Sequence, residues 1–296
     1  MRIAVTGKAG QVVTSLIERG TAAGHEVIAL GRPELDLADP ASVIRVLEAA
    51  APDAIVSAAA YTAVDKAESE SDLAHAVNGA GAGAVAAAAK ALGVPLVHVS
   101  TDYVFDGTLS RPYVESDPTG PTGVYGASKL AGEQAVLAAH GDNSAVLRVA
   151  WVYSPFGANF VKTMLRLAGD RNEVSVVADQ QGNPTSALDI ADGIIRVVTN
   201  LVADSDPELR GTFHMTASGE ASWADFAEAI FAASAARGGP SVRVKRITTA
   251  DYPTPATRPA NSRLDCGLIR QVHGVALPDW HGSLDNVMAR LQPAAD

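Results

Sequence analysis

The sequence predicts an α/β fold with a doubly wound parallel sheet, followed by a smaller α/β lobe. Through about the first 150 residues, short runs rich in Val, Ile and Ala alternate with stretches of helical character. The runs are apolar at nearly every position, which is typical of strands that helices cover on both faces. Strands that alternate with helices in this way favour βαβ units and therefore a parallel sheet.

The predicted elements follow this alternation along the chain. The apolar, β-branched runs predict strands at residues 2–7, 26–30, 54–59, 96–101 and 145–153. The stretches between them predict helices at residues 11–19, 40–50, 71–92 and 126–140. The third of these helices contains an Ala-rich segment, which suits close packing against a sheet. A loop rich in Pro, Gly and Asp, residues 106–123, precedes the last helix.

The second half of the chain keeps the alternation but loses its regularity. Strands are expected at residues 173–179 and 211–217, and helices at residues 187–202 and 223–236. The last stretch is rich in proline and reads as loop. No internal repeat or low-complexity linker separates the two halves, so a smaller lobe packed on the first is expected.

Composition excludes several classes of protein. With 23 Lys and Arg against 33 Asp and Glu, the net charge is −10, which argues against a nucleic-acid-binding surface. The single cysteine, Cys266, excludes an intrachain disulfide and fits a reducing cytosol, so a cytoplasmic location is expected. We expect neither a cleavable leader nor a membrane span. The histidines are scattered singly, so no metal site is predicted.

A glycine-containing turn joins the first predicted strand to the first helix. In VTGKAGQVV, Gly7 and Gly10 stand at this junction. Glycine there lets the backbone turn tightly and approach a pyrophosphate, whose charge the N-terminus of the helix stabilises. This predicts a dinucleotide site of the Rossmann type. Residues 1–153, rejoined by about residues 174–213, are therefore predicted as the dinucleotide-binding domain, and residues 154–296 as a substrate-binding lobe.

The end of the second strand indicates which dinucleotide binds. An acidic residue there bonds the ribose 2′-hydroxyl of NAD, whereas an arginine accommodates the 2′-phosphate of NADP. In ALGRPELD, Gly31 and Arg32 occupy this corner. NADP(H) is therefore the favoured cofactor, with NAD(H) as the alternative.

Tyr125 and Lys129 lie four residues apart at the beginning of a predicted helix. This spacing puts both side chains on one face of the helix. Spacing alone leaves two interpretations open, a catalytic pair or two residues on a helix surface.

Seven segments spread over nearly the whole chain carry a resemblance to a known family. The segments are TGKAGQ (6–11), AAAYTAVDKAE (58–68), STDYVFDG (100–107), VYGASKLAGE (124–133), WVY (151–153), DQQGNPTS (179–186) and RPANSRLD (258–265). In this order they resemble the extended short-chain dehydrogenase/reductase superfamily and, more closely, the dTDP-4-dehydrorhamnose reductase family.

The resemblance implies that the 4-keto group of dTDP-6-deoxy-L-lyxo-4-hexulose is reduced to dTDP-L-rhamnose, a precursor of surface polysaccharide. It implies catalytic roles for Thr101, Tyr125 and Lys129. The implied cofactor site consists of Gly7, Lys8, Gly10, Gln11, Val12, Arg32, Asp36, Leu37, Ala58, Ala59, Ala60 and Thr62, together with Tyr125 and Lys129. The expected partner is the dTDP-sugar, without nucleic acid or membrane, and a homodimer is left open.

The chemistry of these residues suits the reduction of a ketone. Tyr125 would donate a proton to the carbonyl oxygen, and the Lys129 ammonium would lower the tyrosine's usual pKa of about 10 while bonding the nicotinamide ribose. Thr101 ends a strand, where ligands of such folds bind, and its hydroxyl would meet the same oxygen. Glu133 lies one turn beyond Lys129, so the sequence leaves open whether the lysine faces the ribose or Glu133.

Substrate contacts are expected from residues near the same strand ends and from the second lobe. Asp102 is given a supporting role, and Tyr103 and Trp151 are expected to touch the sugar or its nucleotide. Arg258 suits the pyrophosphate as a fork donor, and Asn261 is expected beside it at the dTDP end.

Two departures from the family pattern carry expectations of their own. Val13 stands where the phosphate loop usually has a third glycine, so we expect a small shift of the first helix without loss of cofactor binding. Some family members form a dimer bridged by Mg²⁺ through carboxylates. Here the corresponding helices offer only Glu18 and Asp189, which argues against such a bridge.

The sequence bears on four alternative functions. Dehydratases of this superfamily need a glutamate after Thr-Asp, whereas this chain has Tyr103 there, and epimerising relatives need a cysteine that is missing from the predicted site. A non-catalytic NADP-binding regulatory subunit has no need of the full Thr-Tyr-Lys set. Reductases of other dTDP-4-keto-6-deoxy sugars share the same motifs and stay open as an alternative.

Overall fold

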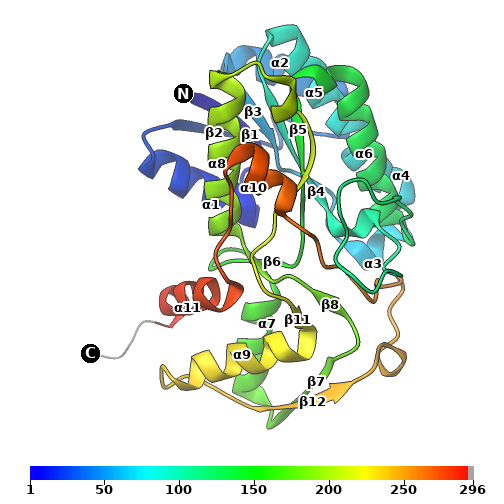
Figure 1. Ribbon diagram of the computed structural model, residues 1–296, viewed down its shortest axis with the longest axis vertical. Helices are drawn as coiled ribbons and strands as arrows, with labels where there is room; N and C mark the ends of the chain where they lie inside the picture. The colour runs from blue at the N-terminus through cyan, green and yellow to red at the C-terminus, as the bar shows by residue number, and fades with distance from the viewer. Residues whose placement is uncertain (293–296) are drawn as a thin grey trace.

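The computed structural model describes residues 1–292, which form two lobes (Figure 1). Within these residues, six parallel strands build the sheet of the larger lobe, in the order β10-β5-β4-β3-β1-β2. They are β1 (Arg2–Thr6), β2 (Glu26–Leu30), β3 (Ala54–Ser57), β4 (Leu96–Thr101), β5 (Ser144–Val149) and β10 (Gly211–His214). The predicted doubly wound parallel sheet is confirmed.

Helices cover both faces of this sheet because successive strand residues point to opposite sides. On one face, α1 (Gln11–Ala22) and α8 (Ala187–Ala203) pack on side chains such as Ile3 and Val5. On the other, α2 (Pro40–Ala50), α5 (Gly81–Leu92) and α6 (Val124–His140) enclose a core that includes Ala4 and Val85. The Ala-rich α5 packs closely against both α2 and α6, as its small side chains suggested.

The smaller lobe has its own apolar core, which includes Tyr153, Phe226, Ile230 and Met288. It is built from α7 (Phe160–Asp170), α9 (Trp223–Ala235), α11 (Trp280–Leu291) and the parallel pair β7 (Glu173–Val177) and β12 (Arg243–Ile247). Two short strand pairs complete the fold, β6 (Val152–Tyr153) with β9 (Thr185–Ser186), and β8 (Gln181–Gly182) with β11 (Ala221–Ser222). The remaining helices are α3 (Val64–Ala67), α4 (Ser71–His75) and α10 (Gly267–His273).

Several predicted elements need correction. The strand expected at 145–153 is divided, because Trp151 adopts a positive φ of 45° and the chain leaves the large sheet as β5 ends. The helix expected at 71–92 contains a π-helical turn, Ala76–Ala80, between α4 and α5. Within the segment expected to rejoin the large lobe, β7 pairs with β12 outside the large sheet, whereas α8 and β10 pack with that sheet, as does α10 later in the chain. The loop-rich C-terminal stretch contains β12, α10 and α11.

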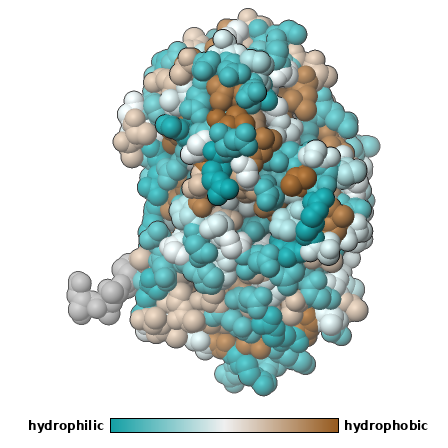
Figure 2. Space-filling model, viewed as in Figure 1, coloured by the Kyte–Doolittle hydropathy of each residue, from teal (hydrophilic) through white to brown (hydrophobic). Residues whose placement is uncertain are grey.

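The surface in Figure 2 is mostly hydrophilic, with small separate hydrophobic patches. The large apolar side chains that are exposed lie on different elements: Ile44, Leu73, Leu137, Val202, Tyr252 and Leu268. Across residues 1–292, no helix combines the length and the apolar character needed to span a membrane.

Candidate active site

Thr101 and Tyr125 come together where β4 ends and α6 begins. Thr101 is the last residue of β4, and its buried hydroxyl donates to Asp102 Oδ1 at 2.9 Å. Tyr125 lies in the first turn of α6, half-buried, with its ring edge-on to Tyr103 at 5.5 Å between centroids. The carboxyl end of a central parallel strand is where ligands bind in such folds. Thr101 and Tyr125, the two side chains expected to act on the carbonyl group of the substrate, therefore lie together at this strand end.

Lys129 follows one turn later on α6 and is almost completely buried. Its Nζ donates to the backbone carbonyl of Val99 at 2.7 Å and lies 3.4 Å from His98 Nε2. Burial lowers the pKa of Lys129 to about 8, against the opposing charge of Glu133.

The Glu133 carboxylate forms its ion pair with Arg148 and not with the Lys129 ammonium. Its two carboxylate oxygens accept from Arg148 Nε at 3.0 Å and Nη2 at 2.7 Å, and Oε1 also accepts from the Ser100 hydroxyl at 2.5 Å. Because the Glu133 carboxylate is bonded to side chains of β4 and β5, it is not the partner that Lys129 faces.

The expected lowering of the tyrosine's pKa is not seen in this structure. Burial raises the pKa of Tyr125 well above its usual range, and the nearby Asp102 carboxyl adds to the rise. The reason is that the Lys129 ammonium is bonded to Val99 and faces His98. Tyr125 is therefore held as the neutral phenol, the form that can donate a proton.

Asp102 and Tyr103 line the same corner. Burial raises the pKa of Asp102 to about 6, and Asp102 Oδ2 is buried without a hydrogen-bond partner in the described part of the chain. Burial also raises the pKa of Tyr103 to about 12. An unpartnered buried carboxylate oxygen beside Thr101 is a group that a bound ligand could satisfy.

The glycine-containing turn fits a dinucleotide. Gly7 has a φ of +105°, a backbone conformation that side chains rarely adopt, and a Cβ there would approach Val13. Gly10 precedes α1 without a side-chain cap, so the amides of the first turn remain available to a phosphate. Val13 is buried in the core, where the family's third glycine would otherwise lie against the sheet.

A cavity of about 530 Å³ extends from this turn toward the end of β2. Its lining includes the predicted cofactor residues Gly7, Lys8, Arg32, Asp36, Leu37, Ala59 and Ala60, and also Leu73 and Val77 from the α4 region. Lys8 is paired with Glu34 at 2.5 Å. Arg32 is exposed and has no ion-pair partner within residues 1–292, so its guanidinium is free to meet a 2′-phosphate.

Other predicted cofactor residues lie around this cavity. The amides of Ala58 and Ala59 donate to the Thr6 hydroxyl at 3.0 and 3.1 Å, which fixes the loop after β3. Thr62 is exposed on that loop, and Val12 is half-buried in α1. Gln11 turns toward the smaller lobe, since its Oε1 accepts from Ser154 at 2.8 Å.

Trp151 lies at the junction of the two lobes. Its ring stacks on Trp223 of α9 at 3.6 Å between centroids and 8° between planes. A side chain at position 182 would collide with it, because a Cβ on Gly182 would come within 2.3 Å of the indole. The half-buried indole is thus held in one orientation beside the end of β5.

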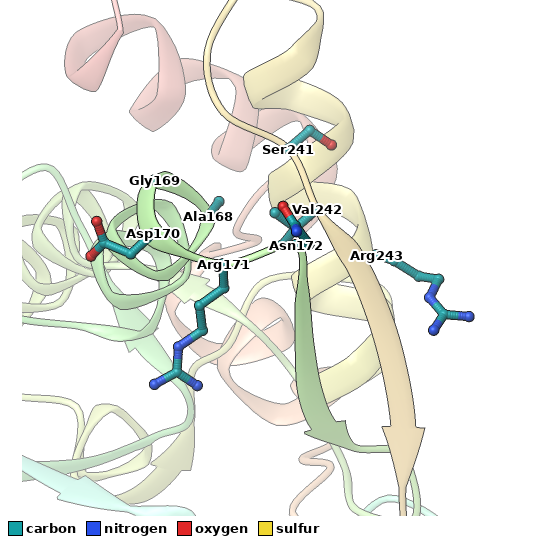
Figure 3. Close-up of a pocket in the computed structure, with 8 residues that line it drawn as sticks. All are labelled: Ala168, Gly169, Asp170, Arg171, Asn172, Ser241, Val242 and Arg243. Carbon is teal, nitrogen blue, oxygen red and sulfur yellow. The ribbon is translucent and has the colours of Figure 1, made fainter.

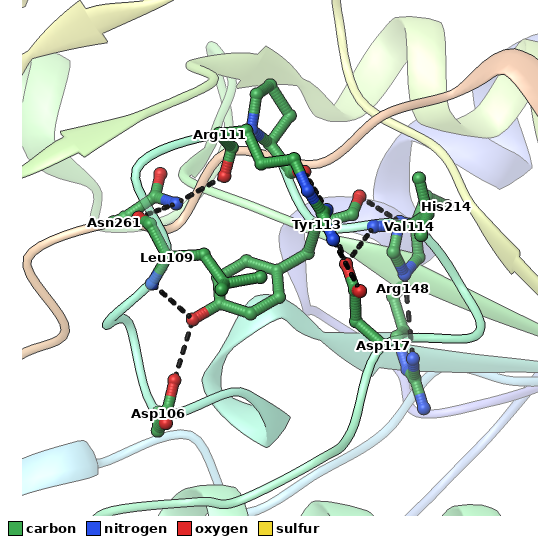
Figure 4. Close-up of polar contacts among 10 residues, drawn as sticks. Asp106, Leu109, Arg111, Tyr113, Val114, Asp117, Arg148, His214 and Asn261 are labelled. Carbon is green, nitrogen blue, oxygen red and sulfur yellow. Dashed lines mark hydrogen bonds and ion pairs between the residues drawn. The ribbon is translucent and has the colours of Figure 1, made fainter.

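Arg258 and Asn261, the two residues expected at the dTDP end, differ in what they can still bind. Arg258 Nη2 is paired with Asp65 at 2.8 Å, while Nη1 is buried and unpartnered in the described chain. Asn261 donates to the carbonyls of Leu109 and Arg111 at 2.8 and 2.7 Å (Figure 4), and its oxygen accepts from Arg263. Both amide hydrogens of Asn261 are committed to this loop, so its observed contacts are structural.

The loop before α6 is held by a network that Figure 4 shows. Tyr113 donates to Asp106 at 2.7 Å, and Arg111 makes a double contact with Asp117 at 2.7 Å. His214 lies between Arg148 and the carbonyl of Tyr113. This network joins β5 and β10 to the loop that precedes α6.

Sequence reasoning missed two buried polar residues that touch the site. Asn78, in the π-helical turn, accepts from the amide of Tyr61 at 2.7 Å and donates to Ser128 of α6 at 2.9 Å. His98 contacts Lys129 from the middle of β4. The signal available for His98 was a polar residue inside the apolar run LVHVST, whereas Asn78 lies in a helix with nothing to distinguish it.

No group of His, Cys, Asp or Glu in the described chain is arranged to hold a metal ion. Glu18 is paired with Arg290 at 2.8 Å, and Asp189 accepts from Ser283 at 2.5 Å. The two carboxylates considered for a metal bridge are therefore each engaged within the chain.

A second hollow, of about 640 Å³, lies on the smaller lobe between the end of α7 and β12 (Figure 3). Its lining includes Arg171 and Arg243, which point away from each other in the figure. It is formed by different elements from those around Tyr125, and its lining does not include Thr101, Tyr125 or Lys129.

Comparison with known proteins shows which family the chain belongs to. The family model for the RmlD substrate binding domain matches residues 1–293. A dTDP-4-dehydrorhamnose reductase of Sinorhizobium fredii is 52% identical over 283 residues, covering 96% of this chain and 95% of that protein. The Escherichia coli K12 protein of the same name is 40% identical over 297 residues, covering 98% of each.

Solved structures agree as well. The dTDP-4-dehydrorhamnose reductase of Clostridium acetobutylicum has a TM-score of 0.92 at 36% identity, covering 99% of this chain and 100% of that one. The Bacillus anthracis protein of that name, in complex with NADP, has a TM-score of 0.90 at 35% identity, covering 98% and 99%. Because sequence and fold agree over nearly the whole length, this chain belongs to the dTDP-4-dehydrorhamnose reductase family.

Proposed function

We propose that the protein reduces the 4-keto group of dTDP-6-deoxy-L-lyxo-4-hexulose to dTDP-L-rhamnose with NADPH, with NADH as a weaker alternative. The observation that carries this proposal is that Thr101 ends β4 and Tyr125 and Lys129 follow in the first turns of α6, in a chain whose α1 begins with an uncapped N-terminus. The names of the relatives supply the substrate. The NADP in the Bacillus anthracis structure supports the cofactor.

Bound NADPH would supply the hydride to the carbonyl carbon. Tyr125, kept neutral by burial, donates its phenolic proton to the carbonyl oxygen as the alcohol forms. The Thr101 hydroxyl would hold that oxygen once its hydrogen turns from Asp102, and the Lys129 hydrogen not taken by Val99 or His98 would have to turn toward Tyr125 to stabilise the tyrosinate that the proton transfer leaves behind.

The cofactor would lie along the edge formed by the ends of β1, β2 and β3. The pyrophosphate would be held at the start of α1 by Gly7, Gly10, Gln11 and Val12. The 2′-phosphate would be bound by Lys8 and Arg32. The adenine would be bordered by Asp36 and Leu37. The backbone under the dinucleotide would be that of Ala58, Ala59, Ala60 and Thr62.

The side chains that would border the sugar are those of Asp102, Tyr103 and Trp151. The Arg258 guanidinium would leave its ion pair with Asp65 and bind the pyrophosphate of the substrate instead. We propose that residues 1–153 with α8, β10 and α10 form the dinucleotide-binding unit, and that most of residues 154–296 form the substrate lobe. A cytoplasmic location and a homodimer stay predictions.

The proposal is tested by NADPH oxidation with the dTDP-4-keto sugar, followed by NMR of the product. We expect turnover and the spectrum of dTDP-L-rhamnose. Turnover with a different product stereochemistry would assign the protein to another 4-keto-6-deoxy sugar. Tight NADPH binding without turnover of any such sugar would instead favour a regulatory subunit.

Replacing Arg32 with Ala should weaken NADPH binding by about tenfold and leave NADH binding unchanged, because only the 2′-phosphate offers a charge to this side chain. Dissociation constants from cofactor fluorescence check this. Arg45→Ala is the matched control, since Arg45 is exposed on α2 and outside the cavity. Equal losses for both cofactors, or for both variants, would contradict the assignment of Arg32.

A further inference from the structure

His98 is a buried imidazole in the middle of β4, and the proposed reaction assigns it no task. Its side chain is 1% exposed, and each ring nitrogen has one polar neighbour. Nδ1 lies 3.1 Å from the Ser57 hydroxyl on β3, and Nε2 lies 3.4 Å from Lys129 Nζ on α6. The ring therefore bridges the strand next to β4 and the lysine of the active site.

The partners define the state of the ring. An ammonium has only N–H donors, so the His98 nitrogen that faces Lys129 must be an acceptor. The hydrogen of a neutral imidazole then lies on Nδ1, where it is donated to Ser57. Burial and the positive charge of Lys129 lower the pKa of His98 well below its usual range, in agreement with a ring that stays neutral.

The contact matters because it limits how the ammonium can be placed. Lys129 Nζ has three hydrogens, of which Val99 O takes one and His98 Nε2 faces another. One donor remains for the ribose or for Tyr125. Two fixed acceptors on β4 thus orient a side chain that otherwise has four rotatable bonds.

We infer that His98 is a positioning residue, which holds the Lys129 ammonium through Nε2 while Ser57 fixes the orientation of the ring. This inference rests on the proposed catalytic role of Lys129. The other titratable or charged groups around the lysine are Tyr125 and Glu133 on α6. Glu133 is neutralised by Arg148 of β5, so His98 is the acceptor side chain left to the ammonium.

The pH dependence of turnover tests the inference. In the wild type, activity that needs the ammonium is complete below the pKa of Lys129 and is lost as the pH rises through about 8. His98→Asn keeps a polar group near the Nδ1 position but removes the acceptor at Nε2. Because the charged lysine loses a hydrogen bond, the alkaline limb should move about one pH unit lower. At pH 8 this shift lowers kcat roughly fivefold.

The matched variant is His98→Gln, whose amide oxygen can occupy the Nε2 position. It loses the contact with Ser57 and disturbs the core as much as Asn does, but its alkaline limb should remain near that of the wild type. If the alkaline limb of the pH profile lay at the same pH in the two variants, the inference would be overturned and His98 would be a packing residue. Thermal unfolding of both variants separates loss of folded protein from loss of turnover.

Ser57→Ala provides an answer even if both His98 variants fail to fold. It removes only the hydroxyl that orients the ring, so the limb should move in the same direction by a smaller amount. An unchanged limb in a folded Ser57→Ala protein would also overturn the inference. Failure of the proposed function is distinguishable, because the wild type would then show no turnover of the dTDP-4-keto sugar at any pH. If the enzyme is a reductase but Lys129 has no catalytic role, Lys129→Met would retain turnover and the wild type would have no alkaline limb near 8.

Discussion

Replacing Tyr125 with Phe is expected to lower kcat by about two orders of magnitude or more, with NADPH affinity nearly unchanged. The phenylalanine ring can keep the edge-on contact with Tyr103, so the packing at the start of α6 is preserved. What is lost is the only hydrogen of Tyr125 that can be passed to the carbonyl oxygen. The expected effect therefore falls on the chemical step.

Steady-state turnover and fluorescence titration with NADPH measure the two quantities separately. Tyr153→Phe is the matched control, because Tyr153 is fully buried and its hydroxyl donates to the carbonyl of Trp280 at 3.2 Å in the smaller lobe. We expect this control to lose some stability and to keep kcat within about twofold. If Tyr125→Phe retained near-normal turnover, another group would have to supply the proton.

Local patterns predicted the parts of the site that depend on local geometry. The spacing of Tyr125 and Lys129 requires only the repeat of a helix, and Thr101 requires only that a strand ends there. The turn at Gly7 likewise depends on a backbone conformation that glycine favours. These features hold whatever packs around them, which is why they could be predicted without a structure.

The electrostatic state of the same residues depends on what surrounds them in the folded chain. The sequence suggested that Lys129 lowers the pKa of Tyr125, yet burial raises it, because the ammonium is bonded to Val99. Asn261 reads as a ligand-binding amide in sequence, whereas loop carbonyls 150 and 152 positions away occupy both its hydrogens. Burial and long-range partners of this kind are not encoded in a local pattern.

The smaller lobe was predicted least well for a related reason. Its strand β12 is mostly exposed and charged, so it lacks the apolar run by which the strands of the large sheet are recognised. The break at Trp151 was missed because a positive φ in a non-glycine residue is uncommon. The stack on Trp223 and the close fit to Gly182 stabilise this conformation, and both partners are distant in sequence.

Removing the carboxylate of Glu133 should lower the free energy of unfolding by about 3–5 kcal/mol. Glu133 and Arg148 are 3% and 6% exposed and share two hydrogen bonds, so Glu133→Ala leaves a guanidinium buried without its countercharge. The Ser100 hydroxyl also loses its acceptor. Urea unfolding followed by circular dichroism measures the change.

Two comparisons distinguish an unpaired buried charge from a general loss of packing. Glu26→Ala breaks an exposed pair with Arg2, whose side chains are 57% and 46% exposed, and should cost less than about 1 kcal/mol. The double variant Glu133→Leu with Arg148→Met removes both charges and keeps apolar volume beside Phe105, over which the guanidinium lies at 5.0 Å. It should recover at least about half of the loss, because a buried ion pair is often replaceable by apolar side chains whereas one of its charges alone is not. A double variant as unstable as the single one would mean that Arg148 stabilises α6 chiefly through its own contacts with Phe105 and His214.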